Sequence, residues 1–174
     1  MPPPKVQNKK RQPPTSSSCN ENQERETKIF LVHGHANALR EGVARFLEKL
    51  GFPVIILNEQ PGKGRTIIEK FTDCTAVAFA VILLTGDDRG GKLMAPESEL
   101  RPRSRQNVIL ELGFFLGRLG RDKVCPLYEY GVELPSDYNG TEFVLVDDSG
   151  AWKLSLAREL KAAGLPVDMN RVVL

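Results

Sequence analysis

The sequence predicts an α/β fold: a flavodoxin-like, open five-stranded parallel sheet with helices on both faces. Short apolar runs alternate along the chain with segments in which apolar residues recur at helical spacing, and this alternation is typical of repeated strand-helix units. The apolar runs are continuous, as expected for strands that are buried on both faces of a parallel sheet. Right-handed crossovers then favour the strand order 2-1-3-4-5.

The folded part of the chain is expected to begin at residue 28. Residues 1–27 contain several prolines and serines and scattered charges, with almost nothing apolar to bury, which is typical of a disordered tail or linker. Residues 28–174 are assigned to one domain, because this length and its aliphatic content are enough for one core.

The first half of this domain begins with a strand at residues 28–32. A helix follows, indicated by the apolar spacing from Leu39 to Leu50, with Asn37 as its candidate N-cap and Gly51 as its C-terminal stop. Residues 54–57 are predicted to form the second strand.

The middle of the chain contains the third strand and the longest predicted loop. A capping-box pattern at residues 66–69 predicts the start of a short helix, and the most apolar run, residues 76–84, predicts the third strand. Residues 87–105 are rich in glycine, proline and charge without periodicity, so we expect a long loop. A clean apolar stripe predicts a helix at residues 106–119.

The last part of the chain completes the sheet. Residues 124–128 predict the fourth strand, and Pro126 within it indicates that this strand is interrupted or lies near a sheet edge. Residues 143–146 predict the fifth strand. A final helix is expected at residues 151–163, with Gly164 as its stop.

Composition restricts the classes of function. The formal net charge of the 174 residues is +2 and acidic and basic side chains are interspersed, so we expect no nucleic-acid partner. The apolar run at 76–84 is far shorter than the ~20 residues of a membrane-spanning helix, and we expect no membrane association. Three widely spaced cysteines, Cys19, Cys74 and Cys125, argue against a disulfide framework and a zinc site and favour the cytoplasm.

In open parallel sheets, ligands bind beyond the carboxyl ends of the strands, where the strand order reverses. His33, Gly34 and His35 follow the first strand at this point. No third ligand lies near the histidines, so we expect no metal site. Two interpretations remain open: Gly34 lets the backbone approach a ligand while an imidazole donates a hydrogen bond, or both histidines only shape the turn.

The helix at 106–119 carries two features of interest. Glu111 lies at the edge of its apolar stripe, where partial shelter would alter its pKa, although periodicity alone favours a simply solvated boundary residue. Leu110 and Phe114 lie on the other side, flanked by glycines. They are expected either to form a self-association surface or to be covered by the loop at 87–105.

The glycine-rich segment after the second strand lacks the spacing of a phosphate-binding P-loop. Lys63 and Arg65 near the start of the predicted helix can still hold a ligand phosphate. No Gly-x-Gly-x-x-Gly follows the first strand, and no Gly-x-Ser-x-Gly occurs. These absences disfavour a hydride-transfer dehydrogenase and a serine hydrolase.

Four segments together resemble one family: residues 28–35 (KIFLVHGH), 58–70 (NEQPGKGRTIIEK), 79–88 (FAVILLTGDD) and 105–117 (RQNVILELGFFLG). The family is the predicted nucleotide-binding TIR-like domain of effectors in bacterial CBASS and Pycsar anti-phage systems. The resemblance implies a TIR-like fold and NAD+ glycohydrolase activity, with Glu111 as the catalytic carboxylate and residues 62–65 as the loop that controls assembly and access. The predicted substrate-binding residues are His33, Gly34, His35, Lys63, Arg65, Thr85, Asp88 and Asn107.

A single carboxylate suffices for the implied reaction. Glycoside hydrolysis usually needs a second carboxyl group to protonate the leaving group, but nicotinamide is already cationic in NAD+ and leaves neutral. Glu111 would stabilise the resulting oxocarbenium ion or trap it covalently, giving nicotinamide and ADP-ribose or cyclic ADP-ribose. NAD+ is then the substrate, and no cofactor is expected.

The resemblance also implies partners: a homo-oligomer on activation through Leu110 and Phe114, and a cyclic-nucleotide-sensing domain or protein as the switch. Two alternatives stay open. A nucleoside deoxyribosyltransferase-like enzyme shares the fold and also uses a glutamate on carbon-nitrogen glycosidic bonds, and a non-catalytic TIR adaptor acts only through assembly.

Overall fold

The computed structural model describes residues 27–56, 77–136 and 142–172. Its centre is a five-stranded parallel sheet in the order β2-β1-β3-β6-β7. The strands are β1 (Ile29–Val32), β2 (Val54–Ile56), β3 (Phe79–Leu84), β6 (Val124–Tyr128) and β7 (Val144–Leu145). Numbered within this sheet alone, the order is 2-1-3-4-5, so the predicted fold class and strand order are confirmed.

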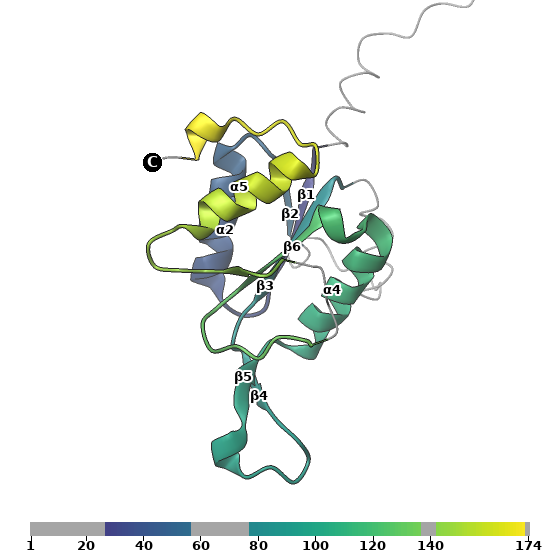
Figure 1. The fold of residues 1–174 in the computed structure, drawn as a ribbon, viewed down its shortest axis with the longest axis vertical. Coiled ribbons are helices and arrows are strands. Elements are labelled where there is room, and N and C mark those ends of the chain that lie inside the picture. Colours follow the sequence, from purple (N-terminus) through teal and green to yellow (C-terminus); the bar gives the residue numbers. More distant parts are fainter. Residues whose placement is uncertain (1–26, 57–76, 137–141, 173–174) are drawn as a thin grey trace, which may run out of the picture.

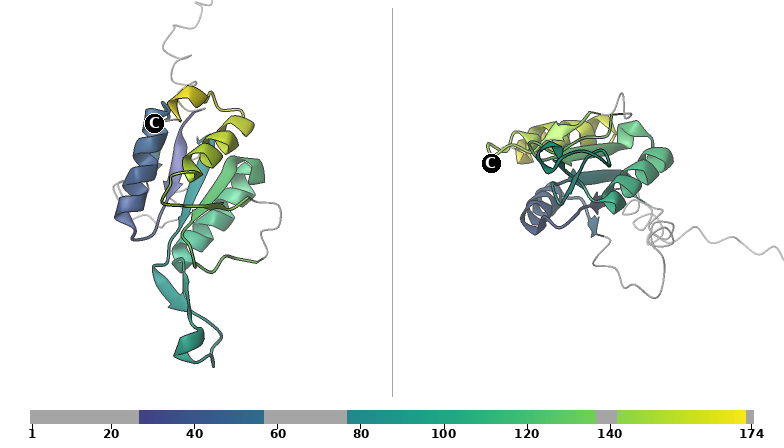
Figure 2. Two further views of the ribbon diagram at one scale, coloured as in Figure 1. Left: turned by 60° about the vertical axis from the view of Figure 1, so that its left-hand side comes forward. Right: turned by 90° about the horizontal axis from the view of Figure 1, so that it is seen from below.

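In the described ranges, three α-helices cover the sheet: α2 (Asn37–Lys49), α4 (Gln106–Leu119) and α5 (Trp152–Ala162). Figures 1 and 2 show α2 and α5 on one face and α4 on the other. Single turns of 3-10 helix occur at Glu97–Glu99, Arg121–Lys123 and Met169–Arg171. In the part of the chain that the structure describes, no helix is both long and apolar enough to cross a membrane.

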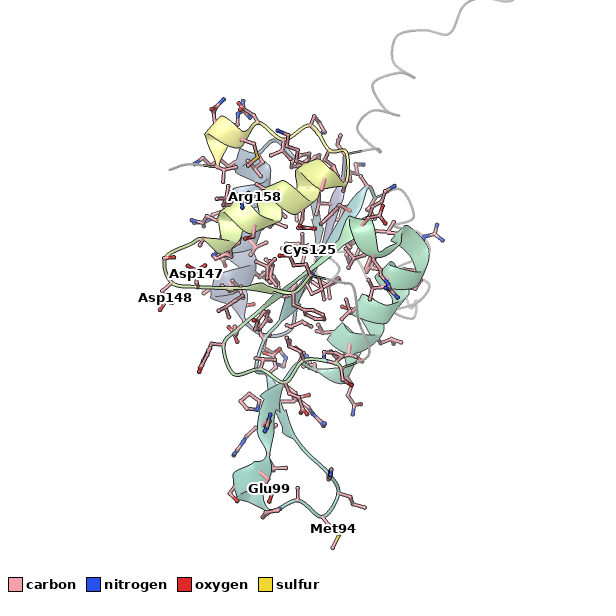
Figure 3. All side chains as sticks on the ribbon, viewed as in Figure 1. Met94, Glu99, Cys125, Asp147, Asp148 and Arg158 are labelled. Atoms are coloured by element: carbon pink, nitrogen blue, oxygen red, sulfur yellow. The ribbon has the colours of Figure 1, made fainter. Side chains whose placement is uncertain are left out.

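Each central strand contributes to two separate cores because successive side chains point to opposite faces. Ile29 and Leu31 of β1 pack with α2 and α5, while Phe30 and Val32 pack with α4. Cys125 of β6, labelled in Figure 3, belongs to the first core, and burial raises the pKa of its thiol. Continuous apolar runs are therefore required here, since both faces of the sheet are covered.

The helix ends agree with the glycine predictions but not with the predicted N-cap. Gly51 and Gly164 adopt φ values of +94° and +88° after α2 and α5, which favour glycine at a helix stop. Asn37 is the first residue of α2 rather than its cap, and Ala36 takes the cap position without a side-chain bond. The turn before α2 is instead held from the loop after β3, because the His35 backbone N–H donates to Asp87.

Pro126 lies within an uninterrupted β6, which is next to the edge strand β7, so of the two predicted alternatives the position near a sheet edge holds. Pro126 pairs with Ile82 of β3, whereas β7 pairs with β6 only from Leu127 onward. One side of the strand is thus free of a neighbouring strand at this position among the described residues. A proline that donates no hydrogen bond is tolerated there.

The predicted loop at 87–105 is wrong in part, because both ends of this segment pair as a two-stranded ribbon, while residues 91–100 between the strands form a loop with one 3-10 turn. β4 (Asp88–Gly90) pairs antiparallel with β5 (Arg101–Arg103), and Figures 1 and 3 show the ribbon projecting from the sheet with Met94 and Glu99 at its far end. Neither face of the ribbon packs on the core. Its strands therefore need no alternating apolar residues, and they contain charged residues instead. Its sequence therefore carries no strand signal.

Candidate functional site

Glu111 lies in α4, between residues that pack on the sheet. Val108, Leu112 and Phe115 of this helix are buried in the core, and the Phe115 ring lies 4.8 Å from that of Phe30. Glu111 itself is only 7% exposed, so it sits deeper than the half-sheltered boundary position predicted from periodicity. Burial raises its pKa from the usual 4.5 to about 7.

The flank of α4 that carries Glu111 follows from the helix geometry. α4 contacts β3, with β6 and β1 on its two sides. Ile109 lies on the β6 side, where it lines a cavity together with Leu134. Residues two positions apart are separated by about 200° around a helix. Glu111 therefore lies on the opposite flank, the side of β1.

The loops after β1 and β3 are tied together by Asp87. Its carboxylate accepts a hydrogen bond from the His35 backbone N–H at 3.1 Å and from the Thr85 hydroxyl at 2.7 Å. A Cβ added to Gly34 would lie 1.7 Å from the Asp87 carboxylate. The close approach expected at Gly34 is thus made by Asp87, and no other residue type fits this position without displacing that side chain.

The start of α4 is tied to the same loop through His35. The Arg105 guanidinium donates to His35 Nε2 at 2.8 Å, and since arginine can only donate, the proton of the neutral imidazole is on Nδ1. His33 Nδ1 donates to the Gly34 carbonyl oxygen at 2.7 Å. In this structure both histidines hold the turn, and the hydrogen bond from an imidazole to a ligand stays a prediction.

The structure brings together only some of the predicted site residues. His33, Gly34, His35 and Thr85 meet at the carboxyl ends of β1 and β3. Asp88 instead begins the ribbon, where it is exposed and opposite Arg103. Asn107 is exposed in the first turn of α4.

Some predictions lie outside the described residues. They are Lys63 and Arg65, the other residues of 58–65, Leu57, the short helix expected at 66–69, Cys19 and Cys74.

Three residues of this network were not among the predicted site residues: Asp87, Arg105 and Glu129, although Asp87 and Arg105 lie within the motifs at 79–88 and 105–117. The Gly86 backbone N–H donates to the Glu129 carboxylate at 3.1 Å, which ties the end of β3 to the end of β6. Glu129 directly follows β6, Asp87 lies three residues after the end of β3, and Arg105 directly precedes α4. An ionisable residue just after a predicted strand or just before a predicted helix is the sequence signal by which these three residues could have been found.

Leu110 and Phe114 differ in exposure. Leu110 is 55% exposed, whereas Phe114 is half-buried and packs its ring nearly perpendicular to that of Phe115, with the centroids 5.3 Å apart. The ribbon points away from the body of the molecule (Figure 1) and does not cover Leu110. Of the two open interpretations, cover by residues 87–105 is thereby excluded for Leu110, and self-association stays a prediction.

The described residues contain no candidate metal site. No group of three or more histidine, cysteine, aspartate or glutamate side chains gathers there in a way that could hold an ion. Among the described residues, the carboxyl ends of β1 and β3 carry a hydrogen-bonded turn, and α4 carries one buried carboxylate on its flank toward β1.

Comparison with known proteins finds a matching family model and several relatives. Residues 28–148 match the family model described as "CAP12/Pycsar effector protein, TIR domain". The chain is 46% identical over 147 residues to the uncharacterized protein YuaY of Escherichia coli K12, covering 84% of this chain and 48% of that protein. It is 35% identical over 133 residues to protein tirC of Dictyostelium discoideum, covering 71% of this chain and 66% of that protein.

A shorter match links the chain to a named effector. CD-NTase-associated protein 12 of Niabella drilacis is 39% identical over 71 residues, which are 41% of this chain and 22% of that protein. The chain thus spans about half the length of YuaY and about a fifth of CD-NTase-associated protein 12.

Proposed function

Because the chain belongs to the TIR-domain family of CAP12 and Pycsar effectors, we propose that it cleaves NAD+ to nicotinamide and ADP-ribose or cyclic ADP-ribose. The observation that carries this proposal is the burial of Glu111 in α4, on the flank of the helix toward β1. A buried carboxylate of raised pKa is a characteristic arrangement for catalysis.

The chemistry of NAD+ matches a site with one such group. The nicotinamide ring is cationic and leaves as a neutral molecule, so the carbon-nitrogen bond breaks without a general acid. The sugar is left as an oxocarbenium ion. Glu111 stabilises this cation through its charge, or traps it as a covalent ester that water or an internal nucleophile then resolves.

The raised pKa of Glu111 fits a positively charged substrate. At neutral pH the unliganded carboxyl group is close to half-protonated, since its pKa is about 7. A cation within a few ångströms favours the ionised form and lowers the pKa. Binding of NAD+ would therefore generate the carboxylate that the reaction needs, and the charge would appear only where it is used.

The biological role proposed here is that of an anti-phage effector of the cytoplasm, which depletes NAD+ on activation. Self-association through exposed Leu110 is the proposed trigger, controlled by a cyclic-nucleotide-sensing domain or protein. This last element rests on the family to which the chain belongs.

The decisive experiment incubates the purified chain with NAD+ and, separately, with deoxynucleosides, with and without a crowding agent. We expect nicotinamide release from NAD+. Base exchange between deoxynucleosides would support the deoxyribosyltransferase-like alternative instead, and the absence of both reactions would support the adaptor.

Self-association is tested by substituting one exposed leucine on α4 and, as a control, one on α5. We expect the specific activity to rise with protein concentration and Leu110→Asp to abolish this rise, because a buried apolar contact between copies would then contain a charge. Leu154→Asp is the matched control, since Leu154 is 39% exposed on α5. Activity independent of concentration, or an equal effect of the two substitutions, would contradict this trigger.

A further inference from the structure

His35 and Arg105 connect the starts of α2 and α4, two helices on opposite faces of the sheet (Figures 1 and 2). His35 directly precedes Ala36, the cap position of α2, and Arg105 is the cap residue of α4. The Arg105 guanidinium donates to His35 Nε2 at 2.8 Å, although the two residues are 70 positions apart in the sequence. This bond therefore joins the two helix starts across the carboxyl edge of the sheet.

Neither of these helix starts is held by a capping side chain. Ala36 has no side-chain acceptor, and Arg105 makes no side-chain hydrogen bond to the first turn of α4. At many helices a Ser, Thr, Asp or Asn side chain at this position accepts a bond from the first turn. Further along α4, Val108 and Leu112 are buried in the core. The bond to His35 thus matters for the first turn of α4 and not for the body of the helix.

The His35 end of the bond is fixed through its own backbone. The His35 backbone N–H donates to the Asp87 carboxylate at 3.1 Å, and the same carboxylate accepts a bond from the Thr85 hydroxyl at 2.7 Å. Gly34 leaves the space that Asp87 occupies beside the turn. The imidazole is therefore presented to α4 from a turn that is tied to the end of β3.

The bond requires a neutral imidazole. Arginine can only donate, so His35 Nε2 must be unprotonated in order to accept. A proton on Nε2 would set an N–H donor against the donors of the Arg105 guanidinium and place a second positive charge beside the first. Histidine is the side chain whose charge typically changes between pH 5 and pH 8. Within this range, acid therefore removes the bond.

The other charged groups around His35 do not replace the lost bond. Asp87 is bonded to the His35 backbone N–H and within its own loop. His33, the other titratable residue of the turn, donates from Nδ1 to a backbone carbonyl oxygen. The first turns of α2 and α4 contain no acidic residue, and helix N-termini carry a partial positive charge. Protonated His35 thus meets positive charge from Arg105 and from both helix starts.

We infer that the bond between Arg105 and His35 is a proton-controlled latch, which joins the starts of α2 and α4 while His35 is neutral and opens when His35 is protonated. Opening leaves the sheet and the bodies of both helices packed, because these are held by the two cores. It releases the Arg105 side chain and loosens the first turn of α4. This inference does not depend on whether Glu111 cleaves NAD+.

The test is amide hydrogen exchange, measured by NMR on the full chain at pH 8 and pH 5 and expressed as protection factors. The reporter is the Ile109 backbone N–H, which donates to the Arg105 carbonyl oxygen at 3.2 Å. We expect its protection to fall several-fold at pH 5, because the residue that accepts its bond is no longer held by His35. Leu112, buried in the body of α4, is the internal control and should keep its protection.

Two substitutions at residue 35 separate the latch from a general effect of acid. His35→Gln keeps a neutral oxygen acceptor that acid does not protonate at pH 5, so protection of Ile109 should be equal at the two pH values. His35→Lys carries a permanent positive charge and should show the low protection at both. His33→Asn is the matched control, since His33 lies in the same turn and does not bond to Arg105, and it should keep the pH dependence of the wild-type protein.

Three results would overturn the inference: no loss of Ile109 protection at pH 5 in the wild-type protein, the same loss in His35→Gln, or full protection in His35→Lys at pH 8. Arg105→Met removes the donor from the other side of the bond and should give low protection at both pH values, which keeps the test valid if a His35 variant does not fold. The same exchange measurement in Glu111→Gln separates the two proposals, because we expect the latch to be retained in that variant when nicotinamide release is lost.

Discussion

Glu111 in α4 and Asp147 before α5 carry the same chemical group in opposite surroundings. Burial raises the pKa of Glu111 to about 7. Hydrogen bonds from the Ser149 hydroxyl and from the Ala151 and Trp152 backbone N–H groups lower the pKa of Asp147 to about 2. Figure 3 shows Asp147 in the loop that leads into α5, far from the ribbon.

The difference separates a structural carboxylate from a reactive one. Asp147 is already stabilised as an ion by donors that also hold the start of a helix, so its charge is satisfied. Burial of Glu111 disfavours its ionised form, and no donor among the described residues stabilises the charge as in Asp147. A cation that enters the site can therefore interact with that charge. An acidic residue is thus identified as a catalytic candidate by the direction of its pKa shift together with its position.

The largest expected effect is on turnover in Glu111→Gln. Glutamine keeps the size of the side chain but can neither balance an oxocarbenium ion nor act as a nucleophile, so nicotinamide release should fall on the order of a hundredfold or more. Glu159→Gln is the matched control, because burial also raises the pKa of Glu159, on α5. A folded Glu111→Gln variant with near-normal turnover would remove Glu111 from its proposed role.

The next effect is the dependence of turnover on pH. The free enzyme needs ionised Glu111, and a pKa of about 7 implies that kcat/KM increases roughly tenfold from pH 6 to pH 8. Steady-state rates at saturating and limiting NAD+ measure this. A profile that is flat above pH 5 would show that the reacting group ionises at an ordinary carboxyl pKa, which contradicts a catalytic carboxyl group of raised pKa.

The contributions of Glu111 and Asp147 to the free energy of unfolding should change with pH in opposite directions. Folded Glu111 keeps its proton up to about pH 7, whereas the unfolded chain releases it near 4.5. The folded state therefore binds more protons in this window, and rising pH destabilises it by up to roughly 3 kcal/mol. Urea unfolding of wild type and Glu111→Gln at pH 5 and pH 7.5 tests this, and the stability difference should move in favour of the variant at pH 7.5.

The smallest effect on turnover is expected in Asp147→Asn. The folded pKa of Asp147 is low, so its stabilisation is present above pH 3.8 and is lost as the pH falls toward 2. At neutral pH the substitution should lower the melting temperature, because the bonds to Ala151 and Trp152 weaken, while turnover per folded molecule stays unchanged. Asp148→Asn, next in the chain, is the control. A loss of turnover in folded Asp147→Asn would contradict the distinction between the two groups.

The sequence predicted the strand order and the helices of the described sheet because apolar runs and helical spacing reflect burial directly. It did not predict the ribbon at 88–103, since that ribbon buries no apolar face. Glu111 was correctly placed in α4, but its depth was not predictable, because periodicity gives the angle of a residue around the helix and not how closely the sheet approaches.

The hydrogen bonds of the site could also not be predicted from the sequence. Asp87 and His35 are 52 positions apart, and Arg105 and His35 are 70 positions apart. Local patterns contain no information about such pairings. Asn37 failed as a cap for the same reason, since the chain before α2 is held by Asp87 and not by its own side chain.

The antiparallel pairing of β4 and β5 brings Asp88 and Arg103 opposite each other, so the ribbon leaves and re-enters the sheet at nearly the same point. Changes in its length therefore need no rearrangement of the strands that carry it. Leu93 and Met94 at its far end are almost fully exposed. This makes the ribbon a convenient attachment point for a fluorescent label or an affinity tag, which could follow association of the chain without touching the sheet.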